Sequence, residues 1–206
     1  MYIPSSFKEE NPDVLFDLIE KHNFGILFSQ HQDKPEATHL PFMVDRKRGK
    51  HGFLIAHFAK ANKHWRNIDE EKELMVVFQG PHTYISPSWY VDRAEVPTWN
   101  YATVHVYGKP TIINDPTQLK KMVTDLTHHH ENNTDSDWSI NEVSTEDLDK
   151  DLKAIVGLEI EITKLEGKFK FNQNKKIEDQ VSVVKKLNEL GINDVSEIMN
   201  RNLNDN

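Results

Sequence analysis

The chain contains no cysteine among its 206 residues. This absence excludes disulfides, thiolate metal ligands and cysteine nucleophiles, and it is typical of proteins that work in a reducing compartment. No apolar run is long enough to cross a membrane, and residues 1–4 lack the basic start of a secretory signal. We therefore expect a cytoplasmic protein with no membrane partner.

Positive charge is also scarce, with 25 Lys and Arg against 33 Asp and Glu and a formal net charge of −8. Binding to nucleic acid depends on neutralising phosphates with basic side chains, so this charge argues against a large non-specific nucleic-acid surface. A local basic patch is still compatible with this charge. The basic concentrations are residues 46–50, which are typical of an exposed hairpin tip, and the lysines at 168, 170, 175 and 176.

The common sequence signatures of catalysis are missing as well. The chain has no glycine-rich dinucleotide or P-loop fingerprint, no nucleophile elbow and no HEXXH spacing. Three consecutive histidines, His128, His129 and His130, would point in different directions on a helix, and we expect them to form a helix end rather than a metal site. We therefore predict no catalytic side-chain triad and no metal ligands.

What the chain does have is a strand-rich pattern with few long helices. Apolar residues make up 37% of the composition, which suits one compact domain, with or without a small helical appendage. Apolar periodicity predicts helices opening at Asn11, near 61–68, from Pro116 to the histidines, and over 176–203 with a break at Gly191. It predicts strands near 24–30, 37–44, 52–57, 73–79, 98–113 and 155–171, and a polar loop over 131–145. The absence of βαβ alternation favours an antiparallel barrel with peripheral helices, a mainly β, α+β fold.

Residues 80–101 are the most distinctive stretch, with two Trp, three Tyr, three Pro and one His. Rings with polar tips suit a flat, partly polar ligand, because their faces stack while their hydroxyl and indole groups find hydrogen-bond partners. The alternative is a proline-stiffened loop that caps a barrel end or forms a dimer contact. The pattern alone leaves both interpretations open.

These residues also resemble a known family. The blocks at 80–90, 96–101 and 104–108, together with 1–7, 38–42 and 57–65, resemble the FMN-binding negative transcriptional regulators of the PaiB type. A weaker match lies at 167–174, where Phe171 and Asn172 depart from the family pattern. The resemblance implies a flavin-binding split β-barrel, built as a homodimer with FMN held between the subunits, that represses degradative-enzyme, protease and sporulation genes.

The resemblance and the residue chemistry together suggest which side chains bind FMN. Cationic and N–H donors after a β-strand suit the phosphate, which indicates His57, Lys60, Asn62 and Lys63. The alternative for these residues is a solvated helix start, and the family usually has proline in place of Lys63. Trp89, Trp99 and Tyr101 are candidate walls for the flavin ring, and Ser86, Asn100 and His105 are candidate hydrogen-bond partners for it. His105 alternates with Val104 and Val106, so we expect it on the opposite face of its strand; a structural histidine is the alternative.

Two domain segments and two classes of function follow. We expect a flavin-binding barrel over 1–173 and a helical extension over 174–206. As a regulator, the chain would contact a DNA operator or a partner protein; no convincing helix-turn-helix is present, and the last helix is acidic. The second class is a flavin-dependent oxidoreductase or NAD(P)H:flavin reductase, in which the cofactor carries the chemistry. A barrel that has lost flavin and serves only as a scaffold is a third interpretation.

Overall fold

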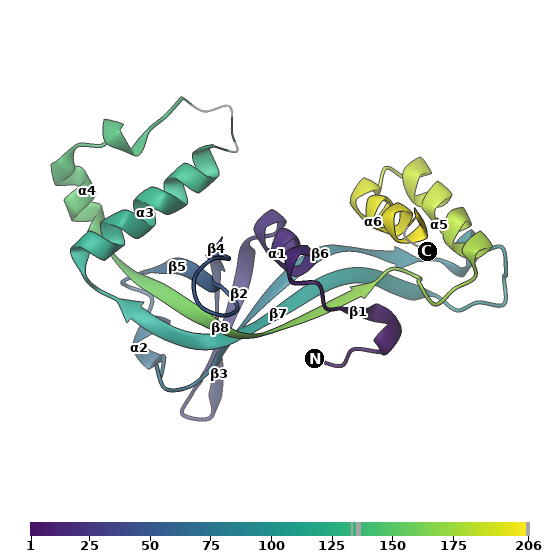
Figure 1. The fold of residues 1–206 in the computed structure, drawn as a ribbon, viewed down its shortest axis with the longest axis horizontal. Helices are drawn as coiled ribbons and strands as arrows, with labels where there is room; N and C mark the ends of the chain where they lie inside the picture. The colour runs from purple at the N-terminus through teal and green to yellow at the C-terminus, as the bar shows by residue number, and fades with distance from the viewer. Residues whose placement is uncertain (133, 135–136, 205–206) are drawn as a thin grey trace. The chain divides into compact units, whose positions relative to one another are not determined.

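The computed structural model describes residues 1–132, 134 and 137–204, which form an antiparallel sheet with peripheral helices (Figure 1). The strands are β1 (Lys8–Glu9), β2 (Phe24–His31), β3 (Lys34–Pro41), β4 (Met43–Asp45), β5 (Phe53–Ala59), β6 (Leu74–Ile85), β7 (Thr98–Ile113) and β8 (Ile155–Lys170). Their order in the sheet is β3-β2-β6-β7-β8-β5-β4, with β1 also paired to β8. The predicted fold class is confirmed.

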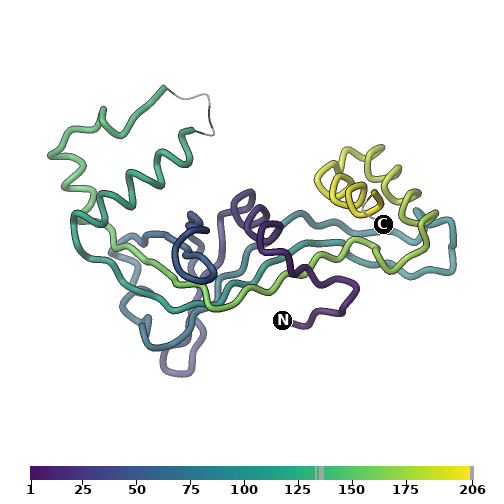
Figure 2. The backbone as a smooth tube through the Cα atoms, viewed as in Figure 1, coloured from purple at the N-terminus to yellow at the C-terminus, as the bar shows by residue number. Residues whose placement is uncertain are grey.

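The helices are α1 (Pro12–Lys21), α2 (His64–Asn67), α3 (Pro116–Glu131), α4 (Thr145–Leu152), α5 (Ile177–Glu189) and α6 (Asn193–Asn204). Helix α1 begins at Pro12, directly after the predicted Asn11, and α3 begins at the predicted Pro116. The Asp115 side chain caps α3 by accepting the Gln118 N–H. The predicted break at Gly191 is also present, since this residue has a φ of +70° between α5 and α6. The backbone trace shows these two helices side by side (Figure 2).

The sequence prediction differs from the structure in three places. One strand was predicted over 37–44, where the structure has β3 and β4. Strand β6 extends to Ile85 instead of ending near residue 79, so the first half of the aromatic block is strand and not loop. Its polar rings concealed an alternation over residues 81–85, in which His82 and Tyr84 are exposed while Pro81 and Thr83 are half-buried and Ile85 is buried. Helix α4 was not expected, because its sequence is mostly charged; Ser144 caps it by accepting the Asp147 N–H.

The chain forms two compact units. Unit 1 comprises Met1–Leu15, Gln79–Val104 and Glu166–Asn206, and unit 2 comprises Phe16–Phe78 and His105–Leu165. Each is described by itself below. The division into a barrel over 1–173 and an extension over 174–206 stays a prediction.

Unit 2 holds most of the barrel core. Leu27, Leu54, Phe58, Phe78 and Leu158 are fully buried there. A Cβ on Gly108 would lie 2.4 Å from the carbonyl oxygen of Glu161, so this position in β7 requires glycine. The close approach of β7 and β8 at this point fixes the strands around the buried side chains.

Unit 1 has a separate core beneath the C-terminal helices. Ile85, Phe171, Leu187, Val195 and Met199 are fully or almost fully buried in it. Helices α5 and α6 lie over one face of the strand segments of this unit (Figure 1). The alternating strand residues on the opposite face are therefore the ones available to a ligand or partner.

Candidate functional site

The turn after β5 in unit 2 carries two exposed lysines. The Lys60 N–H donates to the Ala154 carbonyl at 2.7 Å, and the Asn62 N–H donates to the Ala59 carbonyl at 2.9 Å. Asn62 also accepts the His64 N–H on its Oδ1 at 3.0 Å, which orders the start of α2. The side chains of Lys60 and Lys63 are exposed, and neither forms an ion pair within the described residues. A fixed backbone with two uncompensated ammonium groups is suited to binding an anion.

Behind this turn lies a buried histidine that sequence reasoning did not select. His64 is 4% exposed; its Nε2 lies 2.7 Å from Ser29 Oγ, and its Nδ1 lies 2.8 Å from Thr38 Oγ1. The Asn62 amide donates to the same Thr38 oxygen at 3.3 Å. Burial lowers the pKa of His64, although nearby Glu36 opposes this shift. A neutral imidazole therefore ties the turn to β2 and β3, and a lone histidine in a polar segment gave no signal of this role.

His57 lies on the other face of β5 from the turn network. Its register partner on β8 is Gly157, where a Cβ would meet Met122 and Leu119 of α3. Its neighbour Phe58, by contrast, makes an edge-to-face contact with His64. The Nδ1 of His57 has no hydrogen-bond partner in the described part of the chain, and burial lowers its pKa. Strand alternation thus separates His57 from His64 and from the network around it.

In unit 1, four strand residues of the aromatic block share one surface. We call His82, Tyr84, Trp99 and Tyr101 the aromatic face. Trp99 is 54% exposed and lies 6.0 Å from Tyr84 and 6.3 Å from His82, measured between ring centroids. Lys168 Nζ lies 5.2 Å from the centre of the Tyr101 ring. Exposed rings beside a cation can stack on a flat, electron-poor or anionic ligand.

Asn100 points away from this surface. It is fully buried, and its amide lies 3.5 Å from the Met199 sulfur of α6, while its Oδ1 has no partner among the described residues. Alternation along β7 explains the separation, because neighbouring residues of a strand face opposite sides. The same alternation continues along β7 past Val104, the last residue of this segment of unit 1, into unit 2. There His105 is half-buried between the buried Val104 and Val106, as the sequence predicted.

Ser86 and Trp89 lie at the turn that ends β6. The Ser86 hydroxyl accepts the Ser88 N–H at 3.2 Å and opens the short helix η2 (Pro87–Trp89). Trp89 is half-buried, and its carbonyl accepts a hydrogen bond from Ser182 of α5 at 2.6 Å. Ser86 and Trp89 therefore both have contacts that stabilise the local structure, and these contacts do not depend on a ligand.

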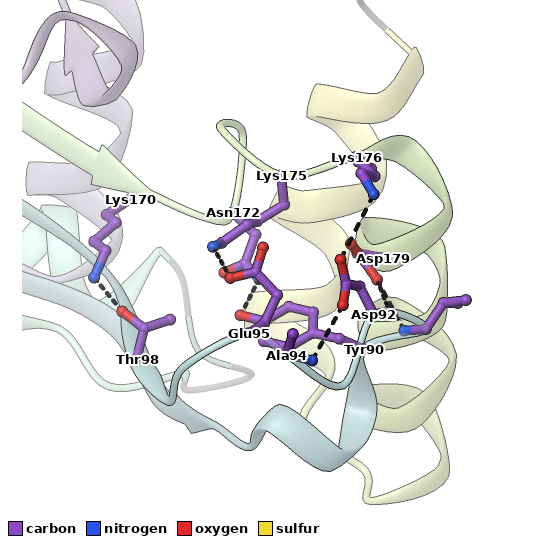
Figure 3. Close-up of polar contacts among 11 residues, drawn as sticks. Tyr90, Asp92, Ala94, Glu95, Thr98, Lys170, Asn172, Lys175, Lys176 and Asp179 are labelled. Carbon is purple, nitrogen blue, oxygen red and sulfur yellow. Dashed lines mark hydrogen bonds and ion pairs between the residues drawn. The ribbon is translucent and has the colours of Figure 1, made fainter.

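Residues 90–97, which join Trp89 to β7, are fastened to α5 (Figure 3). The buried Asp179 accepts the N–H groups of Val91 and Asp92 at 2.8 and 3.0 Å. Lys175 pairs with Glu95, and Asn172 donates to the Tyr90 hydroxyl at 2.8 Å. Burial raises the pKa of Tyr90, which keeps this hydroxyl neutral. The loop between the two tryptophans is thus held in place, and Asp179 is a structural residue that the sequence pattern did not single out.

The three consecutive histidines lie at the end of a helix. His128, His129 and His130 occupy the last turn of α3. Within residues 1–132, 134 and 137–204, no group of three His, Cys, Asp or Glu side chains is placed to bind a metal ion. In the same residues, no helix is long and apolar enough to span a membrane. A cavity of about 730 Å³ in unit 2 is lined by none of the predicted site residues.

Comparison with known proteins identifies the family. The family described as "Putative FMN-binding domain" matches residues 1–164. The chain belongs to this family. It is 36% identical over 187 residues to the protease synthase and sporulation protein PAI 2 of Bacillus subtilis, covering 91% of this chain and 89% of that protein. It is 35% identical over 168 residues to an uncharacterized protein of Saccharomyces cerevisiae, covering 70% and 87% of the two chains.

Solved structures support the same fold at low sequence identity. The flavocytochrome Anf3 of Azotobacter vinelandii matches with a TM-score of 0.58 and 10% identity, covering 80% of this chain and 69% of that one. The FAD and heme binding protein of Mycobacterium smegmatis matches with a TM-score of 0.57 and 13% identity, covering 79% and 73%. These similarities establish the split-barrel fold and carry no conclusion about activity.

Proposed function

We propose that this chain is an FMN-binding negative regulator of transcription of the PaiB type. The observation that carries the proposal is the similarity to PAI 2, at 36% identity over nearly the full length of both proteins. That relative is named for protease synthesis and sporulation. Repression of degradative-enzyme and sporulation genes is the corresponding role for this chain.

The residues of each unit have the chemistry that part of FMN requires. In unit 2, Lys60 and Lys63 offer uncompensated positive charge beside an ordered turn, which suits the phosphate. In unit 1, Trp99 and Tyr101 offer exposed ring faces, which suit the isoalloxazine. When bound, FMN supplies a redox-active ring; the protein side chains contribute its binding and orientation.

We assign the other candidates narrower roles. Trp89 and Ser86 belong to the turn next to the aromatic face, where a ring wall and a hydroxyl donor are still compatible with their backbone contacts. His105 lies on the opposite face of β7 from the buried Val104 and Val106, as expected for a ligand-binding residue. Asn62 accepts the His64 N–H and Asn100 lies against Met199, which limits these two side chains to indirect roles. His57, whose Nδ1 has no partner among the described residues, is kept as a weaker candidate. The strongest candidates are therefore Lys60, Lys63, Trp99 and Tyr101.

The regulator is proposed to be a homodimer with FMN between its subunits, which acts through a DNA operator or a partner protein. The net charge of −8 disfavours broad contact with DNA, so operator binding would depend on a local basic patch. Gel-shift titration with promoter DNA separates the two routes. The alternative function, a flavin-dependent oxidoreductase or NAD(P)H:flavin reductase, predicts that NAD(P)H bleaches the bound flavin faster than free FMN.

Substitution of Lys60 tests the phosphate assignment. Lys60→Ala is expected to weaken FMN binding about tenfold or more, because a charge-assisted hydrogen bond contributes about 1.5 to 3 kcal/mol. Its melting temperature should stay that of the wild type, since the side chain is exposed and unpaired. The measurement is quenching of flavin fluorescence during titration.

Lys34→Ala is the matched control, because Lys34 is also an exposed lysine of unit 2 without an ion-pair partner among the described residues, and it lies at the start of β3. It should bind FMN as tightly as the wild type. Equal affinities for Lys60→Ala and Lys34→Ala would remove Lys60 from the flavin site.

A further inference from the structure

The cavity of about 730 Å³ in unit 2 lies between the β4–β5 hairpin, the end of β7 and α3. Its volume falls within the range of about 300 to 1,000 Å³ that small-molecule sites occupy. Its apolar lining consists of Met43, Val44, Ile55, Ile113 and Met122. Ile55 and Met122 are each 6% exposed and belong to the packed core, while Met43, Val44 and Ile113 are half-buried.

The apolar side chains that line the cavity, which we call its floor, are held by close packing between α3 and the sheet. At Gly157 of β8 a Cβ would lie 2.9 Å from the Met122 sulfur and 3.0 Å from Ile113, so α3 sits directly on the sheet there. Glu159 lies two residues after Gly157 in β8 and is the strand-register partner of Ile55 in β5. Both Glu159 and Ile55 line the cavity. The methionine thioethers in the lining are flexible and polarisable, which lets them adapt to different apolar shapes.

Charged side chains surround this apolar floor, and most of them are already neutralised. Arg48 donates two hydrogen bonds of 2.8 Å to Glu159, and Lys121 pairs with Asp125. Arg46 is held by Glu20 and Asp17, neither of which lines the cavity.

The remaining basic side chain at the rim is Lys47. It is exposed and has no carboxylate partner in the described part of the chain. Asp45, the remaining acid, accepts the backbone N–H of Lys47 at 3.0 Å. Among these side chains, the ammonium of Lys47 is therefore the charge that a ligand can still neutralise.

We propose that this cavity is a second ligand site, which binds a small molecule with an apolar body and one anionic group such as a carboxylate or sulfonate. The body lies on the methionine and aliphatic floor, and the anion meets Lys47 at the rim. None of the residues assigned to FMN lines the cavity, so the proposal does not depend on the flavin assignment.

The probe for this site is 8-anilinonaphthalene-1-sulfonate, an aromatic ring system with one sulfonate. Isothermal titration calorimetry, with the full chain held in saturating FMN, should show saturable binding of one probe molecule per chain. Lys47→Glu should weaken this binding about tenfold or more, because the charge at the rim is reversed. Lys34→Glu makes the same change in net charge at the start of β3, outside the cavity lining, and should leave the affinity unchanged.

A second variant tests the floor independently of charge. Val44→Trp fills the cavity from a half-buried position and should abolish binding while the melting temperature stays close to that of the wild type. Absence of saturable binding to the wild type would overturn the proposal, as would equal affinity in Lys47→Glu or undiminished binding in Val44→Trp. Displacement of the probe by FMN would also overturn it, because the cavity would then be a flavin site.

Discussion

At the scale of single residues, several buried polar groups organise the candidate site without touching its ligand surface. His64 joins the lysine-bearing turn to β2 and β3 through Ser29 and Thr38. Asp179 holds the loop between the two tryptophans through two backbone N–H groups. These side chains determine how firmly the exposed residues are held.

The loop contact of Asp179 makes a stability prediction. Asp179→Ala should lower the free energy of unfolding by about 2 to 4 kcal/mol, because it removes a buried acceptor and leaves two backbone N–H groups without a partner. Glu178→Ala is the control, since this carboxylate is exposed in the same first turn of α5. Urea unfolding measures both. A loss for Asp179→Ala no larger than that for Glu178→Ala would contradict the role of the loop contact.

Two histidines, one buried and one half-buried, predict how the stability of the chain depends on pH. Burial lowers the pKa of His57 and His64, so the unfolded chain binds protons more readily than the folded chain once the pH falls below about 6.5. Stability is therefore complete above this pH and declines as the pH falls through it. The melting temperature should drop between about pH 7.5 and about pH 5.5.

Substitution of His57 assigns part of this drop. His57→Asn should show a smaller fall in melting temperature over the same interval, because it removes one group whose folded pKa is lowered. His51→Asn replaces an exposed histidine of the same unit and should behave as the wild type does. A drop of the same size in His57→Asn and the wild type would show that His57 does not contribute.

At the scale of elements, strand alternation is the feature that sorts the candidate residues. It places Trp99 and Tyr101 on an exposed face of β7 and Asn100 in the core against α6. Trp99→Ala should weaken FMN binding about three- to tenfold, since stacking contributes about 0.5 to 1.5 kcal/mol beyond area burial. The melting temperature should change little, because the ring is largely exposed.

Phe24→Ala is the control for that substitution. Phe24 is an exposed ring in unit 2, 64% accessible and away from the predicted flavin residues in the chain. It should bind FMN as the wild type does when both are titrated in parallel. If Trp99→Ala and Phe24→Ala had the same affinity, the aromatic face would not be part of the flavin site.

The elements also show how far the sequence alone could lead. The starts of α1 and α3, the bounds of β7 and the break at Gly191 were predictable, because proline, glycine and apolar alternation are local signals. The extension of β6 through Gly80 and Pro81 was not, since its exposed rings resemble a loop. Helix α4 was missed for a similar reason, because its two leucines, Leu148 and Leu152, are outweighed by charged residues.

The residues of the candidate site also fall into two groups, those that the sequence predicts and those that it does not. Exposed lysines after a strand and rings near prolines were visible in the sequence. The burial of Asn100, the pairing of His57 with Gly157 and the contacts of His64 and Asp179 depend on which faces meet after folding. Contacts between residues far apart in the sequence produce no periodic pattern from which they could be predicted.

At the scale of the whole molecule, the family assignment and the fold agree. A split barrel with an FMN-binding domain over residues 1–164 accounts for the strand-rich pattern and for the absence of other catalytic motifs. The proposed homodimer would complete the flavin site with groups from two subunits. The central claim is that this assembly retains FMN.

The most direct test is the visible absorption spectrum of the purified full chain after incubation with FMN and desalting, with light scattering on the same sample. We predict a retained flavin band near one FMN per chain on a particle of twice the mass of a single chain. A colourless dimer would contradict the flavin assignment while leaving the dimer intact. A colourless monomer would contradict both.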